Sequence, residues 1–118
     1  MSPDQADKQA AALLTASAAS PLRQVRYELY ARGKEWERVA GELRDILNAG
    51  ERADIEVASA VTPQMRVIGT DREGEEWLPV VKVTPSRDGG QVGFMIESEG
   101  RPIWRNALGP MSPVVVKA

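Results

Sequence analysis

The chain has 118 residues, with 15 lysines and arginines against 17 aspartates and glutamates, and with neither cysteine nor histidine. This length fits one domain, or one domain with a helical appendage. The missing residue types exclude disulfides, thiolate nucleophiles, imidazole metal ligands and histidine-based general acid–base catalysis.

The first predicted element is a helix over residues 3–18. Ser2 suits the N-cap, Pro3 suits the first helical position, and Gln5 completes a capping box. Apart from two leucines, the apolar residues of this helix are alanines, which give a weak packing face. We interpret residues 1–20 as an Ala-rich leader that is helical or partly disordered and that is ordered by contact with a partner.

A long amphipathic helix is predicted next, over about residues 21–49, and it makes up the domain 21–50. Ser20 and Pro21 resemble a second cap-plus-proline start, and Gly50 follows a stop signal. Apolar residues recur at heptad spacing: Leu22, Leu29, Trp36 and Leu43, with Val25, Val39 and Ile46 between them. A helical glycine costs only about 1 kcal/mol, so the segment is either one helix or two helices hinged at Gly33.

After Gly50 the apolar spacing changes to two, which predicts β-strands. The expected strands are 53–59, 65–70, 76–83, 91–97, 102–107 and 114–117, with turns at 71–75, 86–90 and 98–101. Val92, Phe94 and Ile96 are expected to face inward, and Pro79 indicates an edge strand or a bulge. The fold class is therefore α+β, with residues 51–118 forming an antiparallel β-meander or a small barrel of five to six strands.

The heptad stripe over residues 22–46 needs a surface that buries it. One interpretation lays the helix across the open face of the sheet, and the other pairs two copies as a coiled coil, which would give a homodimer. Trp36 is bulky for a coiled-coil seam and Arg32 interrupts the pattern, so packing on the sheet is favoured.

A second stripe of the long helix carries the candidate binding residues. Arg23, Tyr27, Tyr30 and Lys34 follow each other at steps of four, three and four, and Arg26 lies beside them. Arginine and tyrosine dominate the contacts that hold protein interfaces together. Aromatic rings between bases also stack on unpaired nucleotides. A third interpretation packs both tyrosine rings under the sheet.

The sheet offers a second candidate surface. Trp77, Trp104 and the arginines 101 and 105 lie on predicted strands or at their ends. One tryptophan is expected in the core, and an exposed second one beside Arg101 and Arg105 would mark a binding groove.

Other polar motifs carry less chemistry. Asp54 and Glu56 share one face of a predicted strand and are the candidates for a carboxylate-based enzyme. The acidic turn at 71–76 lacks calcium-loop spacing, and the glycines at 89–93 precede a strand rather than the helix that a phosphate site needs. No cofactor or metal is expected.

Together these features favour a non-catalytic protein-interaction module, such as an adaptor, an inhibitor or a small subunit of a larger assembly. A nucleic-acid-binding accessory protein is the alternative, and a carboxylate-based enzyme is the third. The acidic start of the chain does not resemble a signal peptide, and no window approaches the ~20 apolar residues of a membrane span. We therefore expect a cytoplasmic protein without a membrane partner.

Overall fold

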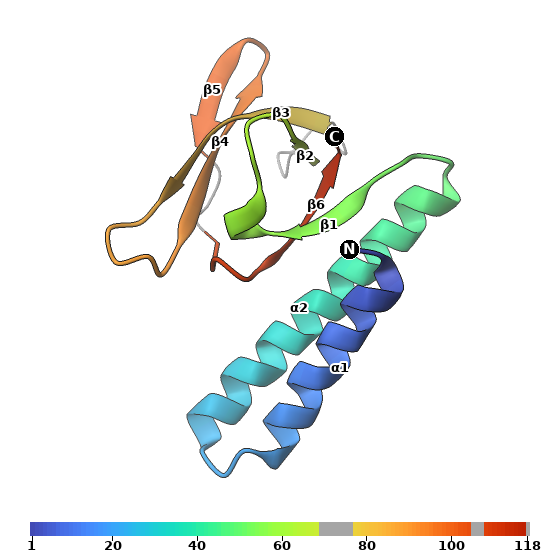
Figure 1. Cartoon of the computed structure of the whole chain (residues 1–118), viewed down its shortest axis with the longest axis vertical. Helices are drawn as coiled ribbons and strands as arrows, with labels where there is room; N and C mark the ends of the chain where they lie inside the picture. The colour runs from blue at the N-terminus through green and yellow to red at the C-terminus, as the bar shows by residue number, and fades with distance from the viewer. Residues whose placement is uncertain (69–76, 105–107, 118) are drawn as a thin grey trace. The chain divides into compact units, whose positions relative to one another are not determined.

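The computed structural model describes residues 1–68, 77–104 and 108–117. The chain divides into two compact units, Met1–Ile55 and Glu56–Ala118. Two helices make up most of the first unit, and a sheet dominates the second (Figure 1). This arrangement confirms the predicted α+β fold with N-terminal helices followed by antiparallel strands.

The elements follow one another in the predicted order. They are α1 (Pro3–Ala19), α2 (Arg23–Asn48), β1 (Asp54–Val57), a 3₁₀ turn η1 (Ala58–Ala60), β2 (Arg66–Ile68), β3 (Trp77–Pro85), β4 (Val92–Ser98), β5 (Arg101–Trp104) and β6 (Pro113–Lys117). Among the described residues, no helix is long and apolar enough to cross a membrane.

Helix α1 begins as its local sequence predicts. The Ser2 hydroxyl accepts a hydrogen bond from the Gln5 N–H at 3.2 Å, and the Gln5 side chain accepts one from the Ser2 N–H at 2.8 Å. Small residues and one leucine form its buried stripe: Ala6, Ala10, Leu13 and Ser17. Helix α1 packs along α2 (Figure 1). The weak apolar face therefore serves as a contact surface for a second helix of the same unit.

Helix α2 runs without a break through Gly33, so the hinged alternative is wrong. A β-carbon on Gly33 would lie 2.8 Å from Leu14 Cγ and 3.3 Å from the Ala10 carbonyl oxygen. The glycine is thus needed because the two helices approach closely at this point. The predicted start was also wrong: Leu22, which has no side-chain cap, is the N-cap, and Ser20 instead ends α1.

Only part of the heptad stripe on α2 is buried within the chain. Trp36, Val39 and Leu43 are at most 3% exposed. Toward the start of the helix, Leu22 is 63% and Val25 38% exposed. The exposed segment of the stripe is consequently the part next to the turn between the helices.

In the part of the chain that the structure describes, six strands are arranged in the order β1-β6-β2-β3-β4-β5. Strands β2 to β5 form the predicted meander of antiparallel neighbours, and β6 returns to lie between β1 and β2. Among the described strands the order ends at β1 and at β5, so the sheet is an open meander rather than a closed barrel.

The core of the sheet contains the inward-facing residues that the alternation predicts. Val92, Phe94 and Ile96 are buried, together with Val67, Val80 and the valines of β6. The turn at 86–90 is closed by the Ser86 N–H, which donates to the Gln91 carbonyl at 2.9 Å. The predicted turn at 71–75 lies outside the described residues.

Pro79 marks neither an edge strand nor the bulge itself. Strand β3 lies between β2 and β4, and Pro79 is in register with Arg66. The register shift falls between Val80 and Lys82. Val80 donates its N–H to Met65 on the β2 side, so the missing N–H of Pro79 falls on the β4 side, next to the irregularity.

Candidate functional site

The turn between α1 and α2 is fixed by a buried hydroxyl. Ser17 is 5% exposed, and its Oγ donates to the Arg26 carbonyl oxygen at 2.6 Å. This bond links the last turn of α1 to the first turn of α2. The neighbouring side chains are therefore presented from a fixed backbone.

An open groove lies on one side of this helical hairpin, and we call it the hairpin groove. Its volume is about 1040 Å³. It is lined by Leu14, Ser17 and Ala18 of α1 and by Arg23, Gln24, Arg26, Tyr27, Tyr30 and Lys34 of α2. The structure thus brings together the four residues of the predicted helix stripe and Arg26 beside them, and adds α1 as a second wall.

Both tyrosine rings of the groove are accessible. Tyr27 is 75% exposed and Tyr30 51% exposed. Neither ring is therefore buried between the two helices. Large, exposed aromatic side chains next to apolar surface are suited to contacts with another molecule.

Positive charge surrounds the groove unevenly. Lys34 Nζ lies 5.7 Å from the centre of the Tyr30 ring and 3.4 Å from the Glu37 carboxylate. Within the described parts of the chain, neither Arg23 nor Arg26 forms an ion pair through its side chain. The two arginines are therefore the cations best placed to bind a carboxylate or phosphate from outside.

The groove residues of α1 were missed by the sequence analysis. Leu14 and Ala18 were assigned to a weak packing face, because the sequence did not indicate which helix would lie beside it. The signal that could have identified Leu14 is Gly33, a glycine inside an otherwise regular helix. Such a residue often marks a close approach by a neighbouring backbone or side chain.

The second candidate surface, on the sheet, is not brought together in the same way. Arg101 and Trp104 are exposed on β5, with Trp104 52% exposed. Alternation along the strand puts them on opposite faces. Arg105 lies outside the described residues. Trp77 is half-buried, with Lys117 Nζ 5.2 Å from its ring centre, so Trp104 is the more exposed of the two sheet tryptophans.

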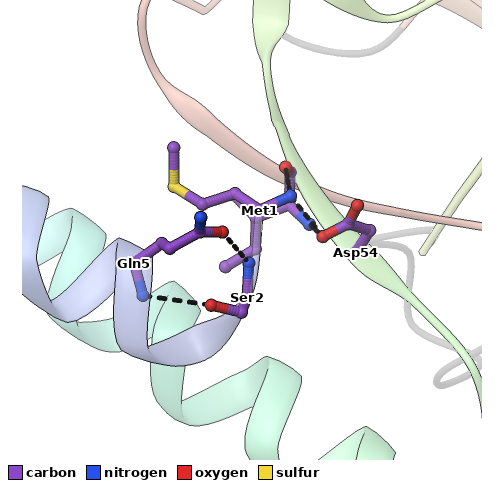
Figure 2. A network of polar contacts seen from close by, with 5 residues as sticks. Met1, Ser2, Gln5 and Asp54 are labelled. Carbon is purple, nitrogen blue, oxygen red and sulfur yellow. Dashed lines mark hydrogen bonds and ion pairs between the residues drawn. The ribbon is translucent and has the colours of Figure 1, made fainter.

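The candidate catalytic carboxylate Asp54 belongs to a network at the start of the chain (Figure 2). The terminal ammonium of Met1 pairs with the Asp54 carboxylate and also donates to the Ile55 carbonyl at 2.9 Å. The Ile55 N–H donates back to the Met1 carbonyl at 3.1 Å. Met1 therefore pairs with Ile55 of β1 through two hydrogen bonds, and the Asp54 carboxylate neutralises the charge of the terminal ammonium.

A metal site is not evident in residues 1–68, 77–104 and 108–117, where no three carboxylates gather closely enough to hold an ion.

Comparison of the chain with known protein families, with curated proteins and with solved structures gives no match in any of the three.

Proposed function

We propose that the chain is a protein-interaction module whose hairpin groove binds an acidic segment of a partner protein. One observation carries the proposal: apolar side chains from α1 and two exposed tyrosine rings share a groove with Arg23 and Arg26, which form no ion pair with any residue that the structure describes. An apolar floor favours apolar side chains of a partner. The two arginines favour carboxylates, which they bind through paired N–H donors.

A protein partner accounts for more of the groove than a nucleic acid does. Leu14 and Ala18 offer aliphatic surface but no group that recognises a phosphate. Tyr30 carries Lys34 near its ring, which leaves Tyr27 as the more open stacking surface. Nucleic-acid binding by accessory proteins of this kind relies on several aromatic platforms along a basic channel, and it is the second candidate here.

The proposal is tested by site-specific cross-linking in cells of the native host. Tyr27 is replaced by the photoreactive p-benzoylphenylalanine, and Arg87, in an exposed turn of the other unit, is replaced in a control variant. We expect a discrete protein adduct from position 27 that is absent from position 87. Mass spectrometry should place the cross-link in a segment of the partner that combines acidic and apolar residues.

Charge reversal makes the test specific to the groove. Adding Arg23→Glu and Arg26→Glu should remove the adduct, because carboxylates would then face carboxylates. Arg32→Glu is the matched control, since Arg32 is exposed on the same helix but does not line the groove. Adducts that survive the double reversal, or that Arg32→Glu removes equally, would refute the proposal.

The nucleic-acid candidate has its own outcome. A protein of that class should bind a single-stranded oligothymidylate with an affinity that falls steeply as salt rises. Adducts digested by nuclease rather than protease would support it over the protein partner.

Four further expectations stay predictions. They are the cytoplasmic location, a contribution from Trp104 and Arg101, a homodimer through the 22–46 stripe and a carboxylate-based activity.

A further inference from the structure

The middle of the hairpin groove offers few backbone hydrogen-bonding groups to a ligand. Leu14 and Ser17 lie inside α1, and Tyr27, Tyr30 and Lys34 lie inside α2, where N–H and C=O groups pair along the helix. Groups without intrahelical partners lie at the end near the turn between the helices, where they are the first-turn N–H groups of α2 and the last-turn C=O groups of α1. A strand laid along this groove would leave its own backbone groups without protein partners.

A helix avoids this cost because its own N–H and C=O groups form hydrogen bonds with one another. The groove residues on α2 repeat at steps of four, three and four, from Arg23 to Lys34. At 1.5 Å per residue this stripe is about 17 Å long. It therefore matches three turns of a helix whose contact residues recur at the same spacing.

The charges along the groove differ between its two ends. Arg23 and Arg26 are without ion pairs in the described part of the chain, whereas Lys34 already has Glu37 at 3.4 Å. At the end near the turn between the helices, the groove therefore carries more positive charge that no described carboxylate balances. A ligand with its carboxylates at one end would be oriented by this difference.

We infer that the segment bound in the hairpin groove is an amphipathic α-helix of a partner protein, about three turns long, with its acidic residues gathered at the end beside Arg23 and Arg26. Bound there, it completes a three-helix arrangement with α1 and α2. Its apolar face covers Leu14, Tyr27 and Tyr30. This inference rests on the proposed function, since it specifies the conformation and polarity of the partner segment.

The test uses four synthetic peptides, each 16 residues long with blocked ends. The first places leucines at helical spacing on an alanine and glutamine background, with three glutamates at one end. The second has the same composition with the leucines at alternate positions, as in a strand. The third replaces the glutamates by lysines, and the fourth moves them to the opposite end.

We expect the helical acidic peptide to bind and to gain helical circular dichroism when it does. Amide shifts in a nuclear magnetic resonance titration should concentrate at residues 14–18 and 23–34. The strand-patterned and lysine peptides should bind at least about tenfold more weakly, the range expected for one central interface contact. Arg23→Glu with Arg26→Glu should weaken binding by a similar factor, whereas Arg32→Glu should not.

A bound peptide should also report its direction. A spin label at its glutamate end should broaden the resonances near Arg23 more than those near Lys34. The peptide with glutamates at the opposite end should bind in the reversed direction, because its glutamates pair with the same two arginines.

Several outcomes overturn the inference. Equal affinity for the helical and strand-patterned peptides would refute the helical conformation, and a label that broadens the Lys34 region would refute the polarity. Failure of every peptide to bind, or a second copy of this chain occupying the groove in sedimentation experiments, would also refute it. In each case a charge-dependent protein cross-link from position 27 would leave the proposed function standing.

Discussion

Gly33 is the helical glycine at which an added β-carbon would crowd the neighbouring helix. In Gly33→Ala the new β-carbon would lie 2.8 Å from Leu14 Cγ and Cδ2. Apolar carbons prefer separations of about 3.5–4.0 Å, so Leu14 must retreat by roughly 0.7 Å or more. The Ala10 carbonyl oxygen, 3.3 Å away, belongs to the backbone of α1 and restricts the direction of retreat.

Gly41 provides the matched control on the same helix. A β-carbon there would meet nothing within 4 Å. Gly41→Ala should therefore raise the free energy of unfolding by about 0.5–1 kcal/mol, the usual gain in helix propensity. Gly33→Ala makes the same gain but loses about 1–3 kcal/mol to overpacking. The two variants should thus differ by about 1–3 kcal/mol, with the propensity gain cancelling.

The assay is urea unfolding followed by circular dichroism at 222 nm, where the helices dominate the signal. A double variant that adds Leu14→Ala should reduce the difference, because the crowded side chain is then absent. The hairpin groove adds a second readout: Gly33→Ala should weaken peptide binding by displacing Leu14, which lines it. Equal stability of the Gly33 and Gly41 variants would refute the close approach of the two helices.

Three further predictions concern the turns and surface ion pairs. The Ser86 hydroxyl and the Gly90 N–H donate to the Asp88 carboxylate and lower its pKa below the ordinary value. This contribution to stability is complete above the ordinary pKa and is lost as pH falls through the lowered one; a nuclear magnetic resonance titration giving a normal or raised Asp88 pKa would contradict it. Gly100 has φ 76°, so Gly100→Ala should destabilise the β4–β5 hairpin by about 1 kcal/mol in thermal unfolding. The carboxylates of Asp7 and Asp4 raise the pKa of the partly exposed Arg44. Arg44→Gln should destabilise the packing of α1 on α2 at low salt but not at high salt; the same loss at both would refute an electrostatic origin.

Several elements could be predicted from short stretches of sequence, because the interactions that form them are local. The capping box at Ser2 and Gln5 predicted the start of α1, and the structure has it at Pro3. Alternation predicted the buried residues of β4, and the turn residues at 86–90 predicted the hairpin before it. In each case the interacting residues lie within a few positions of one another, so the relevant physics is present in a short window of sequence.

The same local reasoning selected the helix stripe of the candidate site. Steps of four, three and four place Arg23, Tyr27, Tyr30 and Lys34 on one face of any helix, and all four line the hairpin groove. The surface of a single helix can be read in this way because its period is fixed. By the same principle, the alternation of a strand turns the side chains of Arg101 and Trp104 to opposite faces.

The neighbours of each element, by contrast, depend on how whole helices and strands pack. Leu14 became a wall of the groove because α1 approaches α2 at Gly33, and β6 entered the sheet between β1 and β2, far from its sequence neighbours. Likewise, the heptad stripe was visible in the sequence, but which of its residues are covered was not. Contacts between distant residues depend on the packing of whole elements, and periodicity within one element specifies a face without specifying its neighbour.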